Sequence, residues 1–174
     1  MIGARHVRGN KIKQKLQPLL TVFSVGIKST KLAAQMTGKK IDHPLKTRYW
    51  SSVPYQLGKG TERVAIKFSA RPCTAHTEVL PDEADDNFLR QAMQKTLSEE
   101  SACMEFLVQP RTRSAMSVED SRTEWLEEEA PFYKVATITI PQQTFDTPEQ
   151  NAFCENLSFT PWHALAEHRP LGSV

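Results

Sequence analysis

The stretch Phe132-Tyr-Lys-Val-Ala-Thr-Ile-Thr-Ile140, with Pro131 before it and Pro141 after it, decides the expected fold. Valine, isoleucine, threonine and aromatic residues favour extended backbone, and prolines at the ends are typical punctuation for a sheet strand. Two earlier runs, residues 64–70 and 104–109, have the same character. In the first of them the residues alternate with the period of two expected for a half-buried strand. The sequence therefore predicts at least three strands of one sheet.

Two helices are predicted outside these strands. Residues 82–100 place apolar side chains on one helical face, and the acidic residues at their start suit the positive end of a helix dipole. Residues 11–35 form a second amphipathic stripe, and whether this helix bends at Pro18 is left open. Residues 42–60 are rich in proline and glycine and are expected to form an irregular connection. The apolar positions are Phe88, Leu89, Ala92, Met93 and Leu97 in the first helix, and Leu16, Leu19, Leu20, Phe23 and Ile27 in the second.

Charge is distributed unevenly along the 174 residues, although the formal net charge is only +2. Residues 1–50 hold 11 lysines and arginines against the single acid Asp42, which leaves 11 basic and 19 acidic residues in the remainder. We interpret residues 1–43 as a basic helical arm and residues 44–174 as the main domain. A solvated helical face is the simplest interpretation of the arm, and binding to nucleic acid, an anionic membrane or an acidic partner are alternatives.

The remaining features point to an intracellular chain. No apolar run reaches the ~18 residues of a membrane span, and no signal-peptide pattern opens the sequence, so a cytoplasmic location is expected. Cys73, Cys103 and Cys154 lie far apart and are interpreted as unpaired thiols. Cys73 and His76 have a Cys-x-x-His spacing, but no second pair completes a zinc site, so no metal ligands are assigned. The acidic stretch 119–129 is expected to form a loop that packs Trp125 against the body.

Several short motifs resemble the catalase superfamily, most closely its smaller catalase-related branch. The most specific are Phe159-Thr-Pro161-Trp-His163 and Arg169-Pro-Leu-Gly172, and the order of the motifs matters more than any one of them. The other matching blocks are Tyr49-Trp-Ser-Ser-Val-Pro-Tyr55, residues 64–72, Val118-Glu-Asp120 with Trp125, residues 141–145, and Asn156-Leu-Ser158. The resemblance covers roughly residues 44–174 and implies an α+β fold: part of a catalase-like antiparallel β-barrel with flanking helices, and haem b as the cofactor.

The resemblance also implies what the chain lacks. In that family a tyrosine of an Arg-x-x-x-Tyr motif binds the iron, on a helix after the Pro-Leu-Gly segment, so residues 44–174 are expected to represent a domain truncated before the haem-ligand helix. The distal histidine and asparagine are also expected to be missing. Tyr49, Tyr55 and Tyr133 are the three tyrosines, and none stands four residues after an arginine. No catalytic residue is assigned.

Five residues are candidates for contact with the cofactor. The resemblance implies that Phe159, with Pro161, packs near the haem, and that His163, His168 or Arg169 contacts a haem propionate or pairs with a carboxylate such as Glu167. Each has a structural alternative. Phe159 would then be an ordinary core aromatic, His163 a hydrogen-bonded packing histidine, and Arg169 a residue that orients the chain at a turn.

The expected function is that of a haem-dependent oxidoreductase whose full-length form decomposes hydrogen peroxide or organic hydroperoxides, by catalase or peroxidase chemistry. The resemblance implies peroxide as the substrate. No nucleic-acid partner is expected, the apolar pattern predicts no integral membrane segment, and a homo-oligomer is left open. Two alternatives remain open. One is an inactive truncated product, and the other is a non-catalytic binding module that uses the basic N-terminal helix on a membrane or an acidic partner.

Overall fold

A computed structural model describes residues 29–31, 33, 34, 38, 40–77, 79, 80, 83–120 and 122–172. The chain divides into two units, Met1–Lys39 and Lys40–Val174, and the fold below is that of the second. Most of the predicted helix over residues 11–35 lies outside the described residues. The basic arm and its possible partners therefore stay predictions.

Three strands and one helix confirm the sequence pattern. The predicted strands are β3 (Val64–Pro72), β4 (Ala102–Pro110) and β5 (Tyr133–Ile140), and the predicted helix is α3 (Phe88–Glu99). α3 begins later than expected, so the acidic residues at its start precede the first turn instead of lying in it. The sequence analysis did not predict two short strands, a second helix and three 3₁₀ turns: β1 (Tyr49–Trp50), β2 (Tyr55–Leu57), α4 (Pro148–Glu155), η1 (Pro44–Lys46), η2 (Gly60–Glu62) and η3 (Ala166–His168).

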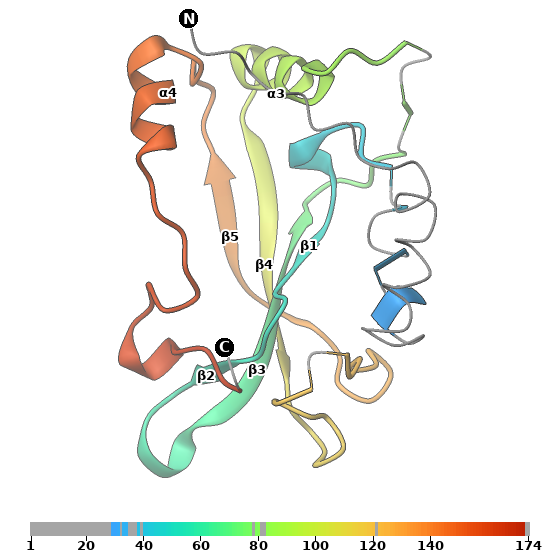
Figure 1. Cartoon of the computed structure of the whole chain (residues 1–174), viewed down its shortest axis with the longest axis vertical. Helices are drawn as coiled ribbons and strands as arrows, with labels where there is room; N and C mark the ends of the chain where they lie inside the picture. Colours follow the sequence, from blue (N-terminus) through green and yellow to red (C-terminus); the bar gives the residue numbers. More distant parts are fainter. Residues whose placement is uncertain are drawn as a thin grey trace, which may run out of the picture. The chain divides into compact units, whose positions relative to one another are not determined.

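The strands form one antiparallel sheet in the order β1-β3-β4-β5, and β2 also pairs with β3. Figure 1 shows the long strands β3, β4 and β5 crossing the molecule side by side, with α3 at one end of the sheet. In the described part of the chain β5 pairs only with β4, and all its residues except Ile140 are exposed. The fold is therefore α+β with an open sheet. The resemblance implies part of a catalase-like barrel, and because the described sheet is open, a barrel is not shown.

The core lies where β3 and β4 meet the loop that follows β4. Leu107 is 2% exposed, and Ser69 and Gln109 are also fully buried. Gln109 Nε2 donates hydrogen bonds to the carbonyl oxygens of Trp125 (2.9 Å) and Ala130 (2.8 Å), which satisfies a buried amide and holds the loop against the sheet. Trp125 is buried with Ala130, so the predicted packing of this aromatic is confirmed.

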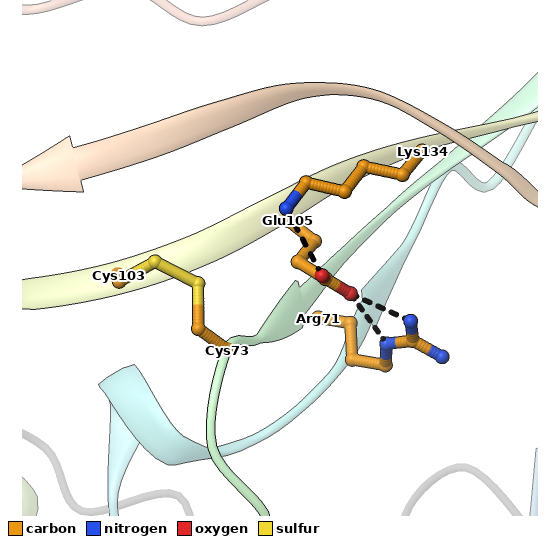
Figure 2. The surroundings of a disulfide bond; sticks show 5 residues. All are labelled: Arg71, Cys73, Cys103, Glu105 and Lys134. Atoms are coloured by element: carbon orange, nitrogen blue, oxygen red, sulfur yellow. Dashed lines mark hydrogen bonds and ion pairs between the residues drawn. A yellow bond between two sulfur atoms is a disulfide. The ribbon is translucent and has the colours of Figure 1, made fainter.

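The interpretation of Cys73 and Cys103 as thiols is wrong, because the two residues form a disulfide (Figure 2). In the antiparallel register Pro72 lies opposite Met104, so the next residues along, Cys73 and Cys103, face each other with Cα atoms 5.5 Å apart. The Cys73 N–H also donates to the Cys103 carbonyl oxygen (3.1 Å). The partners are 30 residues apart in sequence and become neighbours only through the strand register. Cys154 is a free, exposed cysteine.

His43 connects the segment before β1 to α3 through side-chain hydrogen bonds. Its Nδ1 accepts a hydrogen bond from the Leu45 N–H (3.1 Å), so Nε2 carries the proton and donates to Thr96 Oγ1 (2.8 Å). Burial lowers the pKa of His43 below its usual 6.5, and the charge of Lys46 lowers it further. The folded chain therefore protonates this imidazole at a lower pH than the unfolded chain does.

A pH effect on stability follows from His43. Below about pH 6.5 the unfolded chain takes up a proton at this residue before the folded chain does, so the free energy of unfolding should fall as the pH drops from about 7.5 to about 5.5. His43→Asn retains an acceptor for the Leu45 N–H and should reduce that slope. Urea unfolding at both pH values measures it, and an unchanged slope in the variant would rule out His43 as the source.

Asp42 does not interfere with that measurement. Burial would raise the pKa of its carboxyl, but hydrogen bonds from the Val79 N–H (2.6 Å) and His76 Nε2 (2.8 Å) outweigh burial and hold the pKa below 3.8. Its contribution to stability is present above about pH 4 and is lost only as the pH falls further. The two groups therefore act in separate pH windows.

The C-terminal segment runs beside the sheet and returns to β2. Thr147 caps the start of α4, since its side chain accepts a hydrogen bond from the Gln150 N–H, and Pro148 lies in the first turn. Beyond α4 the chain descends along the sheet in Figure 1 and ends in a bridge between Pro170 and Tyr55. Gly172 has φ of +86°, and a Cβ there would collide with the Val118 carbonyl oxygen. This explains why glycine follows Leu171 in the motif Arg169-Pro-Leu-Gly172.

Candidate functional site

An open cavity of about 330 Å³ lies where the C-terminal segment reaches β2. Phe159, Pro161 and His163 line it together with Thr160 and Tyr55. The structure thus brings together three of the five predicted cofactor-contact residues. Tyr55 comes from a strand about a hundred residues earlier, and the sequence analysis did not include it in the site.

Two backbone hydrogen bonds hold the C-terminal segment at this position. The Gln56 N–H donates to the Arg169 carbonyl oxygen (2.9 Å), and the Leu171 N–H donates to the Pro54 carbonyl oxygen (2.9 Å). These two hydrogen bonds flank the bridge between Pro170 and Tyr55 and pair the C-terminal segment with β2. The residues before Arg169 therefore lie near the Tyr55 side chain. An ion pair between Lys59 and Glu167 (2.8 Å) lies at the surface of the same region.

Tyr55 is the first of three rings that cross the sheet. Its ring centroid lies 4.9 Å from that of Phe68 on β3, and Phe68 lies 5.6 Å from Phe106 on β4. Tilted rings at these separations are favourable contacts. The wall of the cavity formed by Tyr55 is therefore supported by packing, whereas the opposite wall is a surface segment.

Phe159 is 86% exposed, so the alternative that it is an ordinary core aromatic is wrong. Trp162 and Leu165, in the same segment, are also more than half exposed. A turn shapes this region, because the His163 N–H donates to the Thr160 carbonyl oxygen (3.0 Å). Several large apolar side chains close together on a surface are typical of a segment that contacts something further, such as a ligand or more protein.

The three predicted polar residues differ in position. His163 is exposed and lines the cavity, which does not fit the alternative of a packing histidine. His168 and Arg169 are exposed and are not among the residues that line it. The Arg169 carbonyl oxygen accepts a hydrogen bond from the Gln56 N–H, and the role of its side chain stays a prediction. Glu167 pairs with Lys59, and that hydrogen bond lowers the pKa of its carboxyl.

These residues do not form a complete site for haem. The Tyr49 hydroxyl donates to the Pro44 carbonyl oxygen (2.7 Å), the Tyr55 ring packs at a tilt against Phe68, and Tyr133 is exposed on β5. None belongs to the tyrosinate motif that the resemblance implies. Within the described ranges no group of three or more histidine, cysteine or acidic side chains converges to hold a metal ion. The cavity offers an aromatic wall and one imidazole, and no reaction step through haem is derived from it.

Comparison with known proteins supports the fold and not the activity. No protein-family model matches the chain, and no curated protein matches it. Among solved structures, the crystal structure of a fungal catalase is similar, with a TM-score of 0.63 and 12% sequence identity. The match covers 75% of this chain and 28% of that one, so the chain spans under a third of the catalase. At this identity the likeness shows similarity of fold alone, over about three quarters of this chain.

No helix in the described part of the chain has both the length and the apolar character needed to span a bilayer.

Proposed function

We propose that the protein to which this chain belongs is a haem b oxidoreductase of catalase type, acting on hydrogen peroxide or an organic hydroperoxide. The fold likeness supports the class. The observation that carries the proposal is the gathering of Phe159, Pro161 and His163 around Tyr55, on the part of the chain where the family motif is most specific. Haem would supply the redox chemistry in the whole protein, and this chain would supply a wall of its pocket.

The residues have distinct roles in this proposal. Phe159 and Pro161 present an apolar surface from which water is excluded when a large planar group covers it. His163 places an imidazole at the edge of that surface, where it can donate a hydrogen bond to a carboxylate. In the whole protein, further strands would pair with the exposed edge of β5 and continue the barrel, since an unpaired edge is a template for strand addition.

The expected cytoplasmic location stays a prediction. Disulfides are rare in that compartment and persist where the environment is oxidising. In the cytoplasm, the Cys73–Cys103 pair would exchange with the cellular thiol pool, because Cys73 is exposed. The oligomeric state is likewise a prediction that the fold leaves open.

A hemin titration tests whether this chain supplies only a wall of the haem pocket and no axial ligand. Because the axial tyrosinate is not provided, we expect absorbance that rises without saturating near about one equivalent and does not shift when peroxide is added. A saturable Soret band that shifts with peroxide would overturn the idea that this chain supplies only a wall. In that case His163→Ala should abolish the band, whereas His168→Ala, outside the cavity, should retain it.

A further inference from the structure

A second and larger cavity, of about 500 Å³, lies between the sheet and the loop that follows β4. Its aromatic lining residues are Trp50 of β1, Phe68 of β3, Trp125 and Phe132, and Lys67 of β3 contributes the cation. Only Glu124, Glu127 and Glu128 add carboxylates to the lining. The volume lies within the range of small-molecule sites, which are mostly apolar with a few placed polar groups.

Lys67 is a half-buried cation without an ion-pair partner. Its Nζ donates to the Thr123 carbonyl oxygen (3.2 Å) and lies 4.9 Å from the centre of the Trp125 ring. Among the residues that the structure describes, no carboxylate lies within ion-pair distance of it. Burial lowers its pKa, and the more distant charge of Glu124 only partly offsets this. An ammonium group has three donors, so this cation retains the capacity to bind an anion.

One of the three carboxylates, that of Glu127, is paired with Arg48. Arg48 Nη1 donates to Glu127 Oε1 (3.0 Å), and its Nε donates to Ser69 Oγ (2.9 Å). The guanidinium lies 5.0 Å from the centre of the Trp50 ring and 4.8 Å from that of Phe132. Its Nη2 is buried with no hydrogen-bond partner in the described part of the chain. Arg48 therefore neutralises Glu127 and fixes two of the cavity's rings.

The charges select the class of ligand. Lys67 can bind one anionic group, while Glu124 and Glu128 are exposed and would repel a ligand with several negative charges. The Trp50 ring is 54% exposed and offers apolar and stacking surface for the body of the ligand, whereas Trp125 is buried and only borders the cavity. From this cavity we propose a binding site for a small aromatic monocarboxylate, with its carboxylate on Lys67 and its ring against Trp50.

Calorimetric titration of the chain with 2-naphthoate tests the site. Lys67→Met keeps the length of the side chain and removes its charge, and it should weaken binding about tenfold or more, since a charge-assisted hydrogen bond is lost. Lys67→Arg should restore most of the affinity. The matched control is Lys134→Met on β5, because Lys134 pairs with Glu105 away from the cavity and should leave binding unchanged.

A second comparison on the unaltered chain guards against variants that do not fold. 2-Naphthalenemethanol and 2-naphthylmethylammonium have the same rings with a neutral or a positive group, and both should bind at least about tenfold more weakly than 2-naphthoate. Equal affinity in Lys67→Met and the parent would overturn the proposal. Tighter binding of the ammonium probe would also overturn it, and would indicate that Glu124 and Glu128 determine the ligand.

Discussion

Replacing Cys73 and Cys103 together with serine is expected to lower the free energy of unfolding by about 3 to 4 kcal/mol. The disulfide joins residues 30 apart, and the loop between them contains α3. Closing a loop of this size in the unfolded chain removes conformational entropy, which accounts for most of the effect in the chain-entropy model. Urea unfolding of the parent and the double variant measures it, and Cys154→Ser, which removes the exposed free thiol, is the matched control.

The ion pairs beside the disulfide should not mask this effect. Glu105 forms ion pairs with Arg71 (2.6 Å) and Lys134 (3.2 Å) on the neighbouring strands. Figure 2 shows these three side chains together with the disulfide. Both cations are about half exposed, and ion pairs of that kind, screened by solvent, contribute little to stability. Two results together would show that the thiols are not paired. The double variant would be as stable as the parent, and both cysteines of the parent would be alkylated without a reductant.

Leu107→Ala should destabilise the chain by about 2 to 5 kcal/mol. The Leu107 side chain is 2% exposed and is among the largest that are fully buried, so its truncation leaves a cavity in the centre of β4. Val135→Ala on the adjacent strand is the matched control. Val135 is 58% exposed and lies at the irregularity where β5 shifts register against β4, so its truncation should cost no more than about 0.5 kcal/mol.

Thermal and urea unfolding of the two variants distinguish a core from a surface position. Similar losses for Leu107→Ala and Val135→Ala would mean that the exposed face of β5 is covered in solution. A loss under about 1 kcal/mol for Leu107→Ala would mean that β4 is not the centre of the core.

The sequence predicted the long strands because their patterns extend over many residues. β3 and β5 are eight or more residues long, which is enough for alternation and for β-branched composition to be recognised. β1 and β2 have two and three residues, too few to show any period. α4 was missed although the sequence Thr147-Pro148-Glu149 carried a recognisable start signal.

Contacts between distant parts of the chain were harder to predict. The disulfide depends on the register of β3 and β4, which periodicity alone does not define. Phe159, Pro161 and His163 were predicted together because they belong to one short motif that resembles the catalase superfamily. Tyr55 joins them only because the chain turns back at Pro170 and pairs with β2. The Lys67 cavity was missed for the same reason, since its walls come from several strands and a loop.

The most direct test is oxygen release from hydrogen peroxide by the protein purified from its complete reading frame, with haem content measured on the same sample. We expect about one haem per chain, oxygen release, and a marked loss of bound haem in Phe159→Ala. Phe153→Ala changes an exposed aromatic on α4 outside the cavity and should retain the haem. A purified protein that binds no haem and leaves peroxide unchanged would contradict the proposed catalase-type function.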